Sequence, residues 1–401
     1  MIGLEQIGEI ARSTPSKIVL LVIDGLGGLP HPETGRTELE SAKTPNLDRL
    51  AREGICGMID PVGPGITPGS APGHLALFGY DPLKFTVGRG ILEALGIEFD
   101  LKPGDVAARG NFCTMDAKGI ITDRRAGRIP TEKCTQLCQL LEAVSIAGVE
   151  IFVSPVKEHR FVVVFRGKGL SSQLSDSDPQ REGLSPKAVS PLSAEATKAA
   201  NIANKFIERA SATLADRYPT NMVLLRGFAR YPDFPKMSEV FSLKPAAIAS
   251  YPMYRGLAKV VGMEILATGA TIEEEFSALA EHYNNYDFFF LHVKETDIAG
   301  EDGDFDRKIR IIEEVDRALP RLIDLDPAVI IVTADHSTPA VLKGHSWHPV
   351  PFLLRSKWCR PDGVEEFSER ACVSGALGSF PATDVMPLAL ANALKLGKFG
   401  A

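Results

Sequence analysis

Long hydrophobic runs are absent from this chain of 401 residues. A helix needs about 20 consecutive apolar residues to cross a bilayer, whereas the run at 18–23 is short and ends at Asp24. The first sixteen residues include Glu5 and Glu9 and contain no apolar segment typical of an export signal. We therefore expect a soluble, cytoplasmic protein that does not enter a membrane.

Long runs of one charge sign are also missing. The 51 acidic and 44 basic residues give a net charge of −7 and are dispersed along the chain. This distribution argues against a protein that binds nucleic acid or another polyanion, and it favours a small molecule as the partner. With 44% hydrophobic residues, the chain can bury a large core, either in two domains or in one domain with an insertion. We expect a monomer or a small homo-oligomer.

Cysteines are few, and no CxxC pair occurs among the six. Because thiols stay reduced in the cytosol, we interpret these cysteines as packing residues. Cys134 and Cys138 lie four positions apart on a predicted helix, and a metal or redox role for this pair is the alternative.

What the chain does contain is an alternation of strand and helix patterns. Continuous apolar runs at 18–23, 288–293 and 328–332 are typical of parallel strands covered on both faces. Predicted helices lie at 44–51, 271–283 and 307–323, and shorter strand patterns with helices at 131–144 and 193–215 occupy the middle of the chain. The sequence thus predicts an α/β fold with a doubly wound sheet, formed by 1–101 and 237–401, and a smaller inserted α/β domain at 102–236.

Ser70 stands in a segment rich in glycine and proline, Ile66–His74, that precedes the apolar run 75–78. Such a segment predicts a loop that enters a helix, so Ser70 lies near free N–H groups that favour an anion such as phosphate. A helix cap is the alternative role for this serine. Carboxylates and histidines elsewhere in the chain favour a nucleophile in metal-assisted phosphoryl transfer.

Acidic and histidine side chains follow three of the predicted strands. They are Asp24, the segment His292–Asp297 and the pair Asp335-His336, and His345 and His348 come shortly after. Nitrogen and oxygen ligands of this kind suit Mn²⁺, Zn²⁺ or a related ion. Two separate clusters predict two metal ions.

Arginines are unusually dense in the predicted inserted domain, at 109, 124, 125, 128 and 160. Arginine is suited to bidentate recognition of phosphate and carboxylate groups. A solvated surface is the alternative explanation for this density.

Five motifs together resemble a known family. They are Asp24-Gly25, Gly-Ser-x-x-Gly-His around Ser70, His-x-Lys-x-x-Asp ending at Asp297, Ala-Asp-His at 334–336, and His345 before Pro349-Val350-Pro351. The segments Ala42–Asp48 and Arg109–Phe112 extend the likeness over nearly the whole chain. In this order they resemble the cofactor-independent phosphoglycerate mutases of the archaeal type, in the alkaline phosphatase superfamily.

The resemblance implies an alkaline-phosphatase-like core with a substrate-binding cap domain. It also implies interconversion of 3-phosphoglycerate and 2-phosphoglycerate through a phosphoserine, without 2,3-bisphosphoglycerate. Two divalent metal ions would assist, with Mn²⁺ expected and Mg²⁺, Zn²⁺ or Co²⁺ as alternatives. Another phosphomutase or a phosphatase of the superfamily, or a non-catalytic metabolite-binding relative, are the rival functions.

The resemblance also implies roles for individual residues. One metal would be held by Asp24, Ser70, Asp335 and His336, with Ser70 as phosphoryl acceptor, and the other by Asp297 and His345. Lys294 would add positive charge. Substrate would be bound by His74, Arg109, Arg124, Arg125, Arg128, Arg226 and Arg255.

Glu301 departs from the family pattern, because the family has a histidine four residues after the aspartate at 297. We expect Glu301 to be a ligand of the second metal and to favour Mn²⁺ or Mg²⁺. Alternatively, Glu301 is a solvated acid and His348 takes part in the second site.

Overall fold

The computed structural model describes residues 3–400, which form two compact units. Unit 1 comprises Met1–Thr86 and Phe234–Ala401, and unit 2 comprises Val87–Asp233. Each unit is described by itself. No helix in the described residues is both long enough and apolar enough to cross a membrane.

Unit 1 is built on a mixed sheet of eight described strands in the order β13-β2-β12-β11-β1-β10-β8-β9. The strands are β1 (Ile18–Ile23), β2 (Ile55–Asp60), β8 (Pro245–Ala249), β9 (Glu264–Ile265), β10 (Phe288–Val293), β11 (Val329–Thr333), β12 (Val350–Ser356) and β13 (Ser379–Pro381). Neighbours in the run β11-β1-β10-β8-β9 are parallel, while β12 is antiparallel to both β11 and β2. The predicted parallel strands are therefore adjacent at the centre of the sheet.

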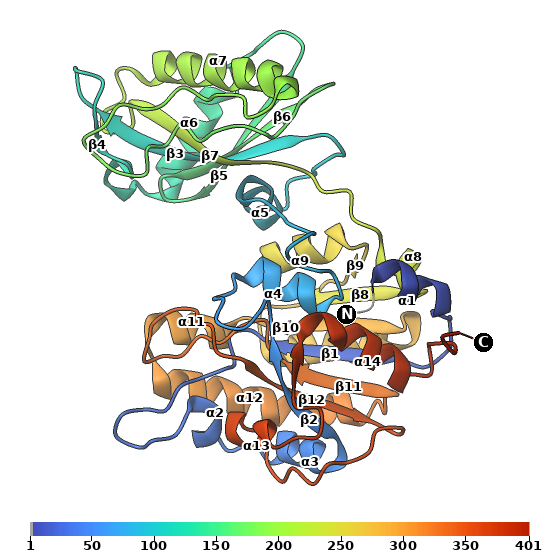
Figure 1. Cartoon of the computed structure of the whole chain (residues 1–401). Coiled ribbons are helices and arrows are strands. Elements are labelled where there is room, and N and C mark those ends of the chain that lie inside the picture. The colour runs from blue at the N-terminus through green and yellow to red at the C-terminus, as the bar shows by residue number, and fades with distance from the viewer. Residues whose placement is uncertain (1–2, 401) are drawn as a thin grey trace. The chain divides into compact units, whose positions relative to one another are not determined.

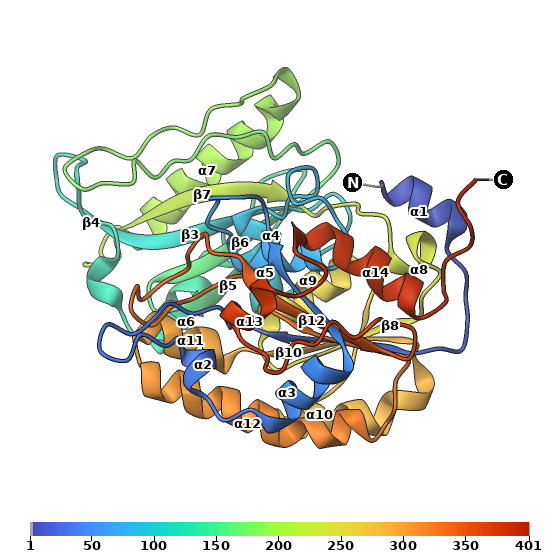
Figure 2. The same cartoon turned by 60° about the horizontal axis from the view of Figure 1, so that its bottom comes forward.

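Helices cover both faces of this sheet. Helices α3 (Pro45–Glu53), α10 (Ile272–His282) and α12 (Phe305–Ile323) lie on one face, and α4 (Ser70–Leu77), α9 (Pro252–Val260) and α14 (Val385–Asn392) lie on the other (Figure 1, Figure 2). The remaining helices of unit 1 are α1 (Leu4–Ile10), α2 (Glu38–Ser41), α8 (Met237–Val240), α11 (Glu295–Asp302) and α13 (Glu369–Val373), with short 3-10 turns at Tyr283–Asn285 and Ala382–Asp384. Strands β1, β10 and β11 are buried along their whole length, as expected for strands covered on both faces.

The pairing register brings three strand ends to one edge of the sheet. Ile23 of β1 pairs with Val293 of β10, and Val22 pairs with Thr333 of β11. The residues that follow these strands therefore leave the sheet side by side, at the carboxyl edge where open α/β sheets bind ligands.

Unit 2 has an antiparallel sheet in which β3 (Val106–Met115) pairs with β4 (Ile121–Asp123), β6 (Arg160–Arg166) and β7 (Met222–Arg230), while β5 (Glu150–Lys157) pairs with β6. Its helices are α5 (Arg89–Gly96), α6 (Thr131–Leu141) and α7 (Thr197–Leu214), with 3-10 turns at Ala126–Arg128 and Ala194–Ala196. Phe112, Phe161 and Phe206 lie in its apolar core, together with Cys134 and Cys138. Those two cysteines are buried and unpaired by a disulfide, which agrees with a packing role.

The predicted α/β class is confirmed, but the unit boundaries differ from the predicted ones at 101/102 and 236/237. Unit 2 already begins at Val87, because α5 packs against β3 and β7. It ends at Asp233. The apolar pattern at 91–95 predicts a short helix. It does not predict which of the two sheets this helix packs on, so it could not place the boundary.

Candidate metal centre

The carboxyl edge of the unit 1 sheet gathers the predicted acids and histidines. Asp24 follows β1, Lys294 and Asp297 follow β10, and Asp335-His336 follow β11. Asp297 lies in the first turn of α11 rather than in a loop. Ser70 is the first residue of α4 and His345 precedes β12, so residues far apart in the sequence meet at one place.

Three acceptor atoms form the first group. Asp24, Asp335 and His336 are fully buried, and their ligand atoms lie within 4.8 Å of one another. His336 Nε2 is 3.1 Å from Asp335 Oδ2 and 3.4 Å from Asp24 Oδ1. Ser70 Oγ lies 3.3 Å from the same nitrogen. The structure therefore brings together the four residues assigned to one metal.

The network of hydrogen bonds around Thr338 assigns the tautomer of His336. Thr338 Oγ1 donates its single hydrogen to Asp297 Oδ1 at 2.6 Å, so it accepts from His336 Nδ1 at 2.9 Å. His336 Nε2 then carries no hydrogen and faces two carboxylates. Asp24 Oδ1 and Asp335 Oδ2 are also buried without a hydrogen-bond partner. Three converging acceptor atoms, two of them carboxylate oxygens without a hydrogen-bond partner, fit a bound cation.

The second group contains Asp297, His345 and again His336. His345 Nε2 lies 3.6 Å from Asp297 Oδ1, and the His336 and His345 rings stack with centroids 3.6 Å apart. His345 Nδ1 donates to the carbonyl of Pro68 at 3.0 Å, which leaves Nε2 free as a ligand atom. Since Thr338 engages His336 Nδ1, Asp297 and His345 are the ligands that belong to this group alone.

Glu301 and His348 lie outside both groups. The Glu301 side chain is 56% exposed, and its Oε1 is 3.8 Å from His345 Nε2. His348 is hydrogen-bonded to Ser346 Oγ at 3.0 Å and stacks on Trp347. Glu301 follows Asp297 by one turn of α11, so its exposed side chain still has one carboxylate oxygen near His345.

Burial and neighbouring charges set the protonation of this centre. Burial opposes ionisation of Asp24, but Lys294 and a hydrogen bond from His292 outweigh it and hold the pKa of Asp24 well below its usual value. Burial lowers the pKa of His336, although Asp335 and Asp24 oppose this. An ionised carboxylate and a neutral imidazole are the forms in which these side chains bind metals.

Lys294 bridges the two groups. Its ammonium contacts Asp24 Oδ2 at 3.2 Å, Asp297 Oδ2 at 2.5 Å and the Tyr254 hydroxyl at 2.9 Å. Burial lowers the pKa of Lys294, but the charges of Asp24 and Asp297 more than reverse this and raise it. Lys294 is therefore a fixed positive charge between the two predicted ligand sets. Tyr254, which contacts this lysine, was not among the predicted site residues. His292, which contacts Asp24, was noted in the predicted segment 292–297 but was given no role of its own.

His74 lies one turn after Ser70 on α4 and is fully buried. Its Nδ1 is 2.8 Å from the Ser70 carbonyl and 3.1 Å from Asp335 Oδ2. Burial opposes protonation, but Asp335 raises the pKa of His74. The side chain is therefore buried against a carboxylate of the first group.

Glycine is needed directly after Asp24. Gly25 has φ +65°, and a Cβ at this position would lie 2.6 Å from Thr338 Oγ1 and 2.9 Å from Asp297 Oδ1. The turn at Gly25 therefore allows the chain that carries Asp24 to approach the other two loops closely.

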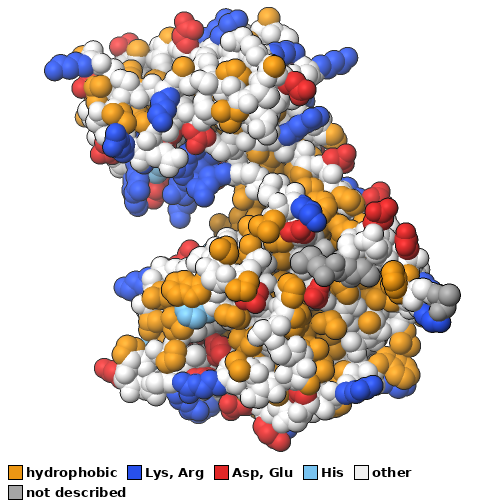
Figure 3. Space-filling view, in the orientation of Figure 1, with side chains coloured by type: hydrophobic (Ala, Val, Ile, Leu, Met, Phe, Trp, Pro, Cys, Tyr) orange, Lys and Arg blue, Asp and Glu red, His pale blue; other side chains and the backbone are white. Residues whose placement is uncertain are grey.

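Five of the predicted substrate-binding arginines belong to unit 2. Arg109 of β3 is opposite Arg226 of β7, and burial lowers the pKa of Arg109 to about 10 despite Glu93, with Arg160, Arg226 and Arg89 nearby. Arg124 makes a bidentate ion pair with Asp178, at 3.0 and 2.6 Å. Figure 3 shows Lys and Arg side chains gathered on one part of the surface of unit 2.

The other predicted arginines are placed differently. Arg125 precedes the 3-10 turn Ala126–Arg128, Arg128 is its last residue, and both side chains are exposed. Arg255 lies on α9 and belongs to unit 1. Arg89 begins α5 and was not among the predicted substrate-binding arginines.

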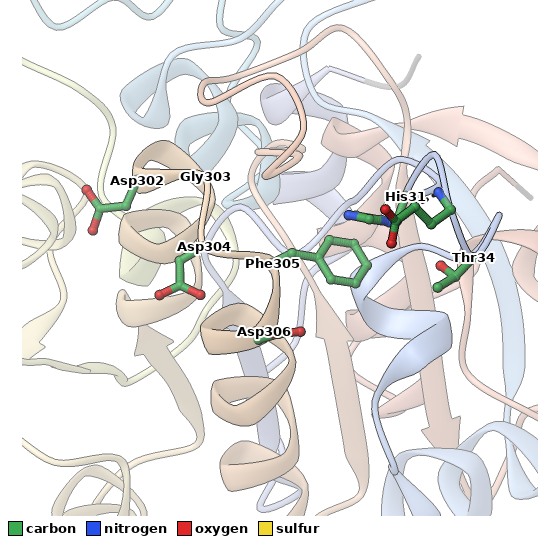
Figure 4. A pocket seen from close by; sticks show the side chains of 8 residues that line it. His31, Thr34, Asp302, Gly303, Asp304, Phe305 and Asp306 are labelled. Atoms are coloured by element: carbon green, nitrogen blue, oxygen red, sulfur yellow. Dashed lines mark hydrogen bonds between the residues drawn. The ribbon is translucent and has the colours of Figure 1, made fainter.

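A hollow of about 630 Å³ at the start of α12 is lined by acids and His31 (Figure 4). Its acidic residues are Glu33, Asp302, Asp304 and Asp306. In the described residues, only the two groups above bring three or more potential ligand atoms within 4.8 Å. The hollow is therefore not a third group of this kind.

Comparison with known proteins identifies the family. A family model for 2,3-bisphosphoglycerate-independent phosphoglycerate mutase matches residues 51–221. A protein of Thermotoga neapolitana, named as a probable mutase of this kind, is 51% identical over 397 residues, which cover 98% of each chain. The chain belongs to the 2,3-bisphosphoglycerate-independent phosphoglycerate mutase family. Phosphoglycerate mutases are isomerases, and the resemblance seen in the sequence is confirmed.

Other relatives agree with this membership. A probable mutase of this family from Thermus thermophilus is 50% identical over 398 residues, again covering 98% of each chain. A solved cofactor-independent phosphoglycerate mutase from Thermoplasma acidophilum has a TM-score of 0.75 and 31% identity, covering 94% of this chain and 100% of that one. A protein structure from Pyrococcus horikoshii has a TM-score of 0.82 and 29% identity, with 97% and 100% covered.

Proposed function

We propose that this chain interconverts 3-phosphoglycerate and 2-phosphoglycerate through a phosphoserine at Ser70, with two divalent metal ions. The observation that carries the proposal is the convergence of Asp24, Asp335 and the bare Nε2 of His336 beside the Ser70 hydroxyl. Family membership supports the reaction, and the arrangement of these acceptors supports the metal-assisted route to it.

Asp24, Ser70, Asp335 and His336 would hold one metal, and Asp297 with His345 would hold the other. When bound, the metals would neutralise phosphoryl charge and favour the ionised form of the serine hydroxyl. We propose Mn²⁺ as the native ion, with Mg²⁺, Zn²⁺ or Co²⁺ as alternatives, because the ligands are carboxylates and imidazoles. Glu301, whose Oε1 lies 3.8 Å from His345 Nε2, would add a further carboxylate at the exposed side of the second site.

The protein's own side chains would position and stabilise the reacting group. Ser70 opens α4, where free N–H groups favour phosphate oxygens, and Lys294 stays protonated because Asp24 and Asp297 raise its pKa. The P–O bond to the substrate would break as the bond to Ser70 Oγ forms. The same phosphoryl group would then pass to the other hydroxyl of the bound glycerate.

The arginines of unit 2 would bind the carboxylate and phosphate of the substrate. Arg109 and Arg226 lie opposite each other, near Arg160 and Arg89, so several guanidinium groups can bind one small anion that carries both a carboxylate and a phosphate. We propose that unit 2 is the substrate-binding unit on this basis. We further propose a cytoplasmic location and no macromolecular partner beyond further copies of this chain, because the substrates are small metabolites of glycolysis.

Incubation of the metal-loaded protein with 3-phosphoglycerate tests the reaction. Formation of 2-phosphoglycerate without free phosphate would support the mutase. Free phosphate alone would support a phosphatase of the same superfamily, and no turnover with bound metabolite would support a binding protein. The Ser70→Ala variant is the control for any activity that does not pass through the serine.

A further inference from the structure

A fully buried lysine lies behind the metal centre and touches neither ligand group directly. Lys308, on α12, has no exposed surface. Its ammonium donates hydrogen bonds to the carbonyl of Thr338 at 2.9 Å and to the carbonyl of Gly27 at 3.2 Å. The proposed reaction gives this buried charge no role.

The two carbonyls belong to the two loops that carry the first ligand group. Gly27 lies in the loop after Asp24, and Thr338 lies in the loop after Asp335 and His336. The Thr338 N–H also contacts the carbonyls of Gly25 at 3.2 Å and Gly27 at 3.0 Å. Lys308 therefore links loops that already touch, and it neutralises part of the negative potential of their carbonyls.

Thr338 connects this lysine to the ligands themselves. While its carbonyl accepts from Lys308, its hydroxyl joins His336 Nδ1 to Asp297 Oδ1. The position of Thr338 thus sets both the tautomer of His336 and the orientation of Asp297. A shift of the Thr338 backbone would disturb one ligand in each group.

Glu38 is the counter-charge of Lys308. Its Oε1 lies 3.8 Å from the ammonium and accepts from the Ala340 N–H at 2.8 Å. Glu38 is also fully buried. Burial lowers the pKa of Lys308, and the charge of Glu38 opposes that effect. Removing either charge would leave the other buried without its strongest opposite charge, which is costly, although Glu369 also acts on Lys308.

We infer that Lys308 and Glu38 are a positioning pair that fixes the loops of Asp24 and His336 and thereby sets the affinity of the metal centre. The inference rests on the metal centre of the proposed function. Partners behind metal ligands typically change metal affinity by about 10- to 100-fold when removed, and a ligand set must be held to within about 0.5 Å.

The test is a titration of metal-free protein with Mn²⁺, in which free Mn²⁺ is followed by electron paramagnetic resonance. Lys308→Met keeps the length of the side chain and removes its charge and its donors. The matched control is Lys395→Met. Lys395 is also fully buried, and its ammonium contacts the Thr14 carbonyl at 2.6 Å and Asp287 Oδ2 at 3.1 Å. Asp287 precedes β10, at the end of the strand opposite the metal centre.

We expect Lys308→Met to weaken binding of at least one Mn²⁺ by about tenfold or more, while Lys395→Met leaves both affinities unchanged. Thermal unfolding of both variants separates this effect from a general loss of stability. If Lys308→Met does not fold, Glu38→Gln takes its place, since it keeps an acceptor for Ala340 and removes the counter-charge.

A second measurement asks whether Lys308 acts through Thr338. If it does, Lys308→Met combined with Thr338→Val should weaken Mn²⁺ binding by less than the product of the two single effects. Unchanged Mn²⁺ affinity in Lys308→Met, or equal losses of affinity in Lys308→Met and Lys395→Met, would overturn this inference but not the proposed metal centre. Wild-type protein that binds neither Mn²⁺ nor any of the alternative ions Mg²⁺, Zn²⁺ and Co²⁺ would overturn the metal centre and the inference with it.

Discussion

At the residue scale, one hydroxyl carries the proposed covalent step. Ser70 Oγ contacts His336 Nε2, and Ser70 does not cap its helix through its side chain, because α4 begins at Ser70 after Gly69. Replacing Ser70 by alanine therefore removes the phosphoryl acceptor and its hydrogen bond with His336, but no helix cap.

We predict that Ser70→Ala abolishes mutase activity and changes the free energy of unfolding by no more than about 1 kcal/mol, the typical net contribution of one hydrogen bond. Coupled assay of 2-phosphoglycerate and thermal unfolding measure the two effects. A variant that keeps a substantial fraction of its turnover would contradict the phosphoserine.

Glu301 and Asp297 lie one turn apart on α11 but differ in exposure. Glu301 is exposed and outside the ligand groups, whereas Asp297, one turn earlier on α11, is buried and within one. We predict that Asp297→Asn weakens the second Mn²⁺ strongly, while Glu301→Gln changes its affinity by less than about threefold, as expected for an exposed charge. Calorimetric titration with Mn²⁺ compares the two. Equal losses of Mn²⁺ affinity in the two variants would show that Glu301 is a ligand.

At the scale of elements, the sequence predicts what depends on local pattern. The apolar runs of β1, β10 and β11 predict strands, and the acids after them predict a shared edge, which the register confirms. The stretch 295–302 is polar and lacks an apolar face, so α11 could not be predicted from periodicity. The contact of His74 with Asp335 also depends on tertiary structure, because it joins α4 to the end of β11.

Helix α10 carries a buried acid whose protonation affects stability. Burial raises the pKa of Glu275 to about 8, although its carboxylate accepts from the Ser250 N–H. Between about pH 4.5 and 8 the unfolded chain has lost this proton and the folded chain has kept it. Stability should therefore fall as pH rises through this window.

We predict that Glu275→Gln makes the protein less sensitive to pH between 5 and 8 and raises its relative stability most at pH 8. Urea unfolding at several pH values measures this, with Glu281→Gln on the exposed side of the same helix as the control. A wild-type stability that does not fall toward pH 8, relative to Glu275→Gln, would contradict the prediction.

At the scale of the whole molecule, the candidate metal ligands and the predicted substrate-binding arginines lie mostly in different units. Both ligand groups lie in unit 1, and the arginines at 109, 124, 125, 128 and 226 lie in unit 2. The shorter strand patterns that begin after residue 101 indicate an inserted domain. Helix α5 precedes them, and its amphipathic pattern is like that of the helices in unit 1. Only its packing against β3 and β7 assigns it to unit 2.

Unit 2 has its own sheet and its own apolar core around Phe112, Phe161 and Phe206, so it has the features of a domain that folds alone. We predict that an excised fragment, 87–233, folds cooperatively and binds no Mn²⁺, while the full chain binds it. Circular dichroism during thermal unfolding and Mn²⁺ titration test the two parts.

A fragment that begins at 102, and so lacks α5, should be less stable than the fragment 87–233, because the faces of β3 and β7 that α5 covers would be exposed to water. Equal stability of the two fragments would show that α5 contributes nothing to unit 2.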